Sequence, residues 1–324
     1  MTQASIRSIL VVDVGGTSVK CGLVVDRAPR AGERLYPSSR LRNSDPVGSF
    51  ARLVREFCGE AGVWPDLMVS TVPGFIDTDG DRVLFAGNVP ELNGHLLASE
   101  LREALGIPVI IERDSVLVLA GEAIAGAARG ADSILGLFFG TGVGGAFLQG
   151  GEAFRGSGWA LEIGHVPFGN EGRTLEGLRT DCLETYVSGR ALEVLAIRHG
   201  IPVTQVFVQA PNIPALGKEV DRFIADQALA IGMAVALFSP ATIVLGGGVC
   251  AIEAFPRQRL EDLVALRAPF AETGRPMDLR WAELGWRAVL YGGLKAADDY
   301  AATTGRDSGA DRAPTVESRR EALP

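Results

Sequence analysis

The stretch that decides the fold is SILVVDVGGTSVKCGLVVD (residues 8–26), because SILGLFFGTGVGGAFLQGG (residues 133–151) repeats its pattern. Aligned without a gap, the two share Ser-Ile-Leu, a glycine at the apex and a leucine beyond it. Each predicts an apolar strand, a glycine turn and a second strand, which is a β-hairpin. The pair predicts a duplicated architecture whose two loops face each other across a cleft, although five identities alone could arise by chance.

The bulk composition narrows the class of protein. The chain has 324 residues, 47% of them apolar and 22% charged, so it can build two domains with ample core. Its net charge of -8 provides no general basic field, which argues against nucleic acid as a partner. No apolar run is long enough to span a membrane, and no secretory leader is evident. The four cysteines are scattered, which indicates a reducing compartment, and we expect a cytoplasmic protein.

The segments around the two hairpins alternate between strand and helix patterns. Residues 67–77 and 108–114 are strand-like, and residues 49–62 and 95–106 have helical spacing, with Gly62 and Gly106 at the expected C-terminal caps. Further on, we expect a long helix over 220–239, a buried strand over 241–249 and a last helix near 286–302. The fold class is therefore α/β.

The domain organisation follows from this pattern. We expect an N-terminal domain over residues 1–113, joined by the last helix (287–302), and a larger domain over residues 114–286. The hinge falls near residues 112–115. From residue 303 onward the sequence is polar and rich in turn formers, which predicts a disordered tail.

The first glycine turn has the composition of an anion-binding loop. Gly15 and Gly16 allow backbone N–H groups to converge on a phosphate, and Thr17 and Lys20 can add donors. Asp13, at the end of the strand, can hold Mg²⁺ through water. The alternative is a plain hairpin whose charged side chains are solvated.

Two further glycine clusters follow predicted strands. Gly140, Thr141 and Gly142 begin a GxGxxG match, but a dinucleotide-binding fold requires a helix directly after the glycines, and AFLQGG predicts a strand there instead. Gly246, Gly247 and Gly248 would let a base or ribose lie against bare backbone. Three such loops at strand ends indicate a nucleotide-binding cleft more strongly than any one of them alone.

Five motifs carry a resemblance to a known family. In order and spacing, DVGGTSVK, GTGVGG, LEIGHVPFG, CLETYVSGRAL and IVLGGGV resemble the ROK family of sugar kinases, within the actin-like ATPase superfamily, over about residues 8–300. GNVPEL, ERDSVLVLAGE and LFSPATIVLGGGVCAIEAFPRQRL are most similar to the D-allose kinases of that family.

The resemblance implies a fold, substrates and an assembly. The fold is a duplicated, ribonuclease-H-like pair of domains that closes over ATP and a hexose, and the enzyme is a homodimer. It transfers the γ-phosphate of ATP to the 6-hydroxyl of the hexose, with Mg²⁺ as cofactor. D-allose is the first expected substrate; a glucokinase, a fructokinase or an N-acetylhexosamine kinase is the alternative.

The resemblance also implies residue roles. Asp114 matches the catalytic base, which takes the proton of the attacking hydroxyl. The positions that match sugar contacts, with Arg113 added as a possible donor, are Gly74, Asn88, Arg113, Asp114, Glu162, His165 and Glu184. Without the resemblance, we would interpret Asp114 as a helix cap or an ion-pair partner, and His165 as a core histidine.

The sequence departs from the family pattern at three places. Many members bind structural zinc through the EIGH histidine and three cysteines, but those cysteine positions fall on Leu175, Gly177 and Cys182 here, so we expect no zinc. Charged partners in the same loop, such as Arg173, Glu176, Arg179 or Asp181, are expected to hold it instead. Arg113 replaces a common asparagine, and Leu161 replaces a glycine.

Two other functions stay open. Some relatives are sugar-sensing repressors with a DNA-binding module ahead of the kinase-like body, but the first predicted strand begins near Ser8. A degenerate kinase that binds sugar without turnover is the second, and the presence of Asp13, Lys20 and Asp114 argues against it.

Overall fold

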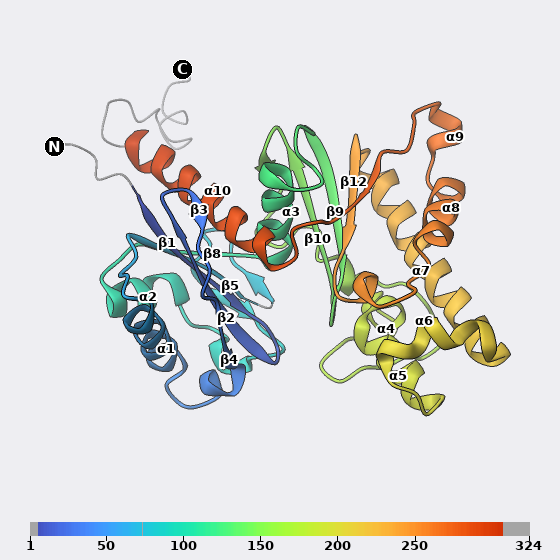
Figure 1. The fold of residues 1–324 in the computed structure, drawn as a ribbon, viewed down its shortest axis with the longest axis horizontal. Coiled ribbons are helices and arrows are strands. Elements are labelled where there is room, and N and C mark those ends of the chain that lie inside the picture. The colour runs from blue at the N-terminus through green and yellow to red at the C-terminus, as the bar shows by residue number, and fades with distance from the viewer. Residues whose placement is uncertain (1–5, 73, 307–324) are drawn as a thin grey trace, which may run out of the picture.

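The computed structural model describes residues 6–72 and 74–306 (Figure 1). Its first sheet has the strand order β3-β2-β1-β5-β8, with β4 paired to β2. The strands are β1 (Ser8–Val14), β2 (Ser18–Val25), β3 (Ala28–Pro29), β4 (Arg34–Pro37), β5 (Leu67–Thr71) and β8 (Val109–Glu112). Helices α1 (Pro46–Ala61) and α2 (Leu97–Leu105) pack on it, and a small hairpin of β6 (Phe75–Ile76) and β7 (Val83–Phe85) lies beside it.

The second sheet repeats the first. Its order is β11-β10-β9-β12-β13, made of β9 (Ser133–Phe139), β10 (Val143–Gln149), β11 (Glu152–Ala153), β12 (Thr242–Gly246) and β13 (Leu279–Trp281). The helices of this half are α4 (Glu184–Val187), α5 (Gly189–Arg198), α6 (Val206–Gln209), α7 (Pro214–Phe238), α8 (Arg257–Arg267) and α9 (Phe270–Thr273). In both sheets the antiparallel hairpin is followed by parallel strands, so the predicted duplication and α/β class are confirmed.

Local signals in the sequence account for several helix ends. Pro46 starts α1, and the side chain of Asp45 accepts a hydrogen bond from the N–H of Gly48. The helices α1 and α2 end at Gly62 and Gly106, whose φ angles of 67° and 70° are left-handed. Both predicted C-terminal caps are therefore confirmed.

Three predicted boundaries were wrong. Helix α7 begins at Pro214 rather than Val220, because a proline in the first turn is compatible with a helix start. The strand expected over 67–77 ends at Thr71 and resumes only as β6. Helix α10 (Trp286–Arg306) continues through residues 303–306, which were assigned to the tail, while residues 307–324 lie outside the described part.

Helix α3 (Asp114–Ala125) lies between the two sheets, and α10 runs from it across the first sheet (Figure 1). Leu117 joins a buried cluster with Val11 of β1 and Leu290 of α10. Val116 and Leu119 instead join a cluster with Val244 of β12. The helix thereby fixes the spacing of the two halves. In the described residues no single helix is apolar and long enough to cross a membrane, and only α5 joined to residues 203–212 at a bend of 88° meets both criteria.

Helices α3 and α10 touch backbone to backbone. A Cβ added at Gly121 would overlap the carbonyl of Ala288, and one added at Gly292 would overlap that of Leu117. Glycine at both positions is what permits this close crossing.

We therefore expect Gly121→Ala or Gly292→Ala to lower the free energy of unfolding by about 1–3 kcal/mol through overpacking. Gly59→Ala is the matched control, since Gly59 is an exposed residue of α1 with no neighbouring atom within 4 Å of an added Cβ. Replacing that helical glycine should raise stability by about 0.5–1 kcal/mol. Urea unfolding of the three variants tests this; equal, small effects at Gly121 and Gly59 would refute the close crossing.

Candidate functional site

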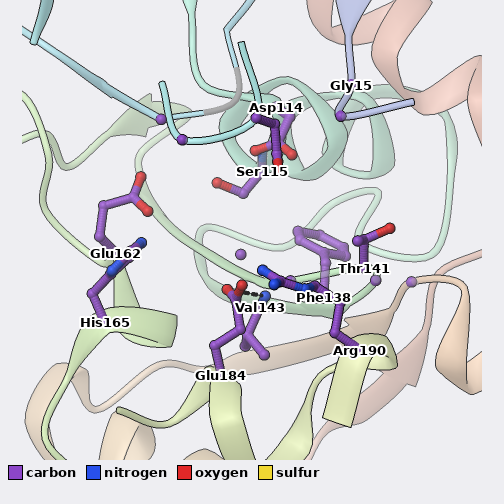
Figure 2. A pocket seen from close by; sticks show the side chains of 18 of the residues that line it. Gly15, Asp114, Ser115, Phe138, Thr141, Val143, Glu162, His165, Glu184 and Arg190 are labelled. Atoms are coloured by element: carbon purple, nitrogen blue, oxygen red, sulfur yellow. Dashed lines mark hydrogen bonds between the residues drawn. The ribbon is translucent and has the colours of Figure 1, made fainter. Parts of the chain in front are cut away.

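A cavity of about 320 Å³ lies between the two halves, at the hairpin turns (Figure 2). Figure 2 shows Asp114 and Ser115 on one side of it, Glu184 and Arg190 on the opposite side, and Glu162 and His165 closing a third side. The predicted residues that line it are Asp13, Gly15, Gly16, Gly74, Asn88, Asp114, Gly140, Thr141, Gly142, Glu162, His165, Glu184 and Gly247.

Five predicted residues do not line this cavity: Thr17, Lys20, Arg113, Gly246 and Gly248. Lys20 instead pairs with Glu33 at 3.4 Å and lies over the ring of Trp286, 4.6 Å from its centroid. Gly246 is the buried last residue of β12, and Gly248 immediately follows Gly247. Arg113 is buried and contacts Glu162, which does line the cavity.

Asp13 and Asp114 are the two carboxylates contributed by the first half and α3. Oδ1 of Asp13 accepts a hydrogen bond from the hydroxyl of Thr71 at 2.7 Å, and burial raises the pKa of Asp13. Asp114 is the first residue of α3, and its Oδ1 accepts from the N–H of Ser115 at 2.6 Å. Burial, and then the charge of Asp13, raise the pKa of Asp114. Both groups therefore hold protons more tightly than free aspartates.

Glu184 fixes the second glycine turn. Its Oε2 accepts a hydrogen bond from the N–H of Val143 at 3.0 Å, which Figure 2 marks. The N–H of Gly189 donates to the carbonyl of Gly140 at 2.8 Å, so the start of α5 holds the other end of the turn. Strand β10, not a helix, follows these glycines, and the dinucleotide-binding alternative is therefore wrong.

Glu162 precedes the short 3₁₀ turn Ile163–His165, and His165 is its last residue. Burial is the main cause that raises the pKa of Glu162 to about 7, with Asp114 and Glu184 adding to it and Arg113 opposing it. Burial, and then Arg179, lower the pKa of His165, so its imidazole is neutral at pH 7. The His165 ring packs edge to face against the ring of Phe75, with 5.0 Å between the ring centroids.

Sequence reasoning missed several residues that line the cavity: Ser115, Val118, Phe138, Leu178, Phe85 and Arg190. Arg190 had a signal, since it lies within the motif CLETYVSGRAL (residues 182–192). Its guanidinium donates to the carbonyl of Glu176 at 2.6 Å, within the loop for which we predict no zinc. The apolar members carried no signal, because a buried phenylalanine or valine is ordinary in any core.

The loop over residues 170–182 is held by a carboxylate. Asp181 accepts hydrogen bonds from the N–H groups of Gly172 and Arg173, both at 2.9 Å, and from the hydroxyl of Tyr186 at 2.5 Å. The guanidinium of Arg173 lies 4.1 Å from the Tyr186 ring centroid. Cys182 is buried. Within residues 6–72 and 74–306, no three His, Cys, Asp or Glu side chains are grouped as metal ligands; the absence of zinc stays a prediction.

Comparisons with known proteins place this geometry in a family. The family model described as ROK family matches residues 9–299. An N-acetyl-D-glucosamine kinase of Vibrio parahaemolyticus is 30% identical over 256 residues, which is 74% of this chain and 84% of the relative. The ROK hexokinase of Thermus thermophilus superposes with a TM-score of 0.74 at 26% identity, covering 91% of this chain and 99% of that one. A ROK family glucokinase from Streptomyces griseus, solved with glucose and AMPPNP, gives 0.71 at 24% identity, covering 90% and 99%.

The two-domain fold and these matches define a carbohydrate kinase, an ATP-binding transferase. The chain belongs to the ROK family. The predicted fold, family and enzyme class are confirmed. The finer likeness to D-allose kinase has no support among these relatives, which agree better with the alternatives named beside it.

The contribution of Asp181 to the stability of the loop over residues 170–182 can be tested by substitution. Asp181→Ala should lower Tm, because it removes the acceptor of three hydrogen bonds, whereas a metal chelator should leave the Tm of the parent protein unchanged. Asp262→Ala is the control, since Asp262 is exposed and, among residues 6–72 and 74–306, its side chain accepts a hydrogen bond only from that of Gln258. Thermal unfolding and elemental analysis test this; one zinc per chain together with a chelator-sensitive Tm would contradict it.

Proposed function

We propose that the protein transfers the γ-phosphate of ATP to the 6-hydroxyl of a hexose or an N-acetylated hexosamine, with N-acetyl-D-glucosamine as the first substrate to test. The observation that carries the proposal is the position of Asp114, a carboxylate at the start of α3 that lines the same cavity as both glycine turns and as Glu162, His165 and Glu184. Such a cavity offers hydrogen-bond acceptors for several hydroxyl groups of a sugar.

The proposed mechanism gives Asp114 the role of general base. Its raised pKa matches a group that must accept a proton near neutral pH, and it would take the proton of the hydroxyl as the bond to phosphorus forms. The turns at Gly15 and Gly140 would hold the phosphates through backbone N–H groups, so that donor and acceptor are aligned. Asp13 would hold Mg²⁺ through water, and the ion would neutralise phosphate charge when bound.

The choice of sugar rests on the relatives. An N-acetyl-D-glucosamine kinase is 30% identical to this chain, and we therefore propose N-acetyl-D-glucosamine ahead of D-allose, the substrate that the short motifs suggested. D-glucose is the second candidate. A cytoplasmic homodimer, with domains over 1–113 plus 287–302 and over 114–286, stays part of the proposal.

The base is tested by Asp114→Asn. The amide cannot accept the proton, so we expect kcat to fall by roughly 10²- to 10⁴-fold. The Kd for sugar should change little, because the amide keeps the shape and one acceptor oxygen. A coupled ADP-release assay and calorimetric titration give the two quantities; parental kcat in this variant would exclude Asp114 as base.

The substrate is tested by a screen of the parent enzyme. We expect the largest kcat/KM with N-acetyl-D-glucosamine, followed by D-glucose, and a lower value with D-allose, in a coupled assay with ATP and Mg²⁺. Preference for D-allose would restore the prediction from the motifs. Binding of a sugar without any ADP release would instead support the sugar-sensing alternative.

A further inference from the structure

Arg113 is the largest of the side chains that are buried almost completely, with 2% of its surface exposed. It follows the last residue of β8 and precedes Asp114, yet it does not line the cavity. A buried guanidinium is costly unless other groups use its charge and its N–H donors. Nε and Nη2 have no hydrogen-bond partner within the described residues. Arg113 therefore contributes little to stability, and its position calls for a role in the site.

The one nitrogen of Arg113 that is engaged reaches the segment that carries Glu162. Nη1 donates to the carbonyl of Ala160 and lies 3.4 Å from Oε1 of Glu162. Glu162 lines the cavity, whereas Arg113 does not. The guanidinium thus contacts the substrate cavity only through Glu162.

The residue between these two contacts has an unfavourable backbone. Leu161 has a φ of 63°, a left-handed conformation that costs a residue with a side chain about 1–2 kcal/mol. The bond from Arg113 to the carbonyl of Ala160 holds the peptide just before this leucine. The two departures from the family pattern, Arg113 and Leu161, therefore meet at one place.

A second pair fastens the start of the same segment. Glu112 pairs with Arg155, and its other carboxylate oxygen accepts the N–H of Arg113 at 2.9 Å. Glu112 thus holds the start of the segment from Arg155 to Glu162, and Arg113 holds its end.

We propose that Arg113 is a positioning residue that fixes the backbone at Ala160 and the carboxylate of Glu162, so that Glu162 accepts hydrogen bonds from the sugar. The inference rests on the proposed function and assigns Arg113 no contact with substrate. This differs from the expectation that Arg113 donates directly to a sugar hydroxyl. Lysine would keep the positive charge near Glu162, but it lacks the planar guanidinium that places Nη1 against both the Ala160 carbonyl and Glu162.

The electrostatics of Glu162 agree with this arrangement. Arg113 lowers the pKa of Glu162, whereas burial and the charges of Asp114 and Glu184 raise it; His165 shares the cavity and is neutral. Loss of Arg113 should therefore raise the pKa of Glu162 further. Below that pKa the protonated carboxyl is a poorer acceptor, so kcat/KM for sugar should begin to fall at a higher pH than in the parent.

A double-mutant cycle separates positioning from direct binding. We expect Arg113→Met and Glu162→Gln each to raise the sugar KM by about tenfold or more, with the KM for ATP changed less than about twofold. If Arg113 acts through Glu162, adding Arg113→Met to Glu162→Gln should change the sugar KM by less than about twofold. Effects that multiply would show that Arg113 acts independently, and would overturn the proposal.

Two further readouts exclude a merely structural role. The Tm of the double variant Arg113→Met with Glu162→Gln should stay close to that of the parent, because both members of the ion pair are replaced by neutral side chains. Arg113→Lys should keep the pH profile closer to that of the parent than Arg113→Met, while leaving the sugar KM raised. Arg280→Met is the matched control: it removes an arginine that pairs with Asp278 and should leave the sugar KM unchanged. An unshifted pH profile in Arg113→Met would contradict the proposal.

The proposed function can fail separately. If the parent protein phosphorylates no sugar, the same cycle is read from the Kd for N-acetyl-D-glucosamine and D-glucose by calorimetry, and non-additive Kd changes still support the role of Arg113. Additive changes alongside normal turnover would overturn the inference on Arg113 alone. Absence of binding to both sugars would refute both.

Discussion

The close crossing of α3 and α10 is the constraint on which the rest of the structure depends. Gly121 and Gly292 let the two backbones touch, and α3 packs on the first sheet through Leu117 and on the second through Leu119. Because α3 begins with Asp114, the same packing that sets the distance between the halves also sets the position of this carboxylate in the cavity. The cavity is thus lined by the first residues of the helix that packs against both sheets.

The cavity concentrates acidic groups in a partly desolvated space. Burial is the first cause of the raised pKa of Asp13, Asp114, Glu162 and Glu184 alike, and neighbouring carboxylates add to it for the last three. Hydroxyl groups of a sugar would supply donors to these acceptors, and a magnesium ion would supply positive charge beside Asp13. Binding would therefore relieve the electrostatic cost of grouping these carboxylates.

Local patterns in the sequence predicted much of the fold. The hairpins and the caps at Gly62 and Gly106 depend on neighbouring residues, so they could be recognised directly. The convergence of Asp114, Glu162 and Glu184 on one cavity depends on tertiary packing, and only the family resemblance supplied it. Neither the local patterns nor the family resemblance predicted where individual side chains point. Lys20 lies over the ring of Trp286 and Arg113 contacts Glu162, although their motif positions suggested contact with ligands.

We propose that the two halves align ATP with the 6-hydroxyl of a sugar, so that the phosphate is transferred to that oxygen. The most direct measurement is ³¹P nuclear magnetic resonance of the product made from N-acetyl-D-glucosamine or D-glucose with ATP. The account predicts a phosphate monoester whose phosphorus couples to both protons on carbon 6. A phosphate on carbon 1, or inorganic phosphate alone, would contradict it.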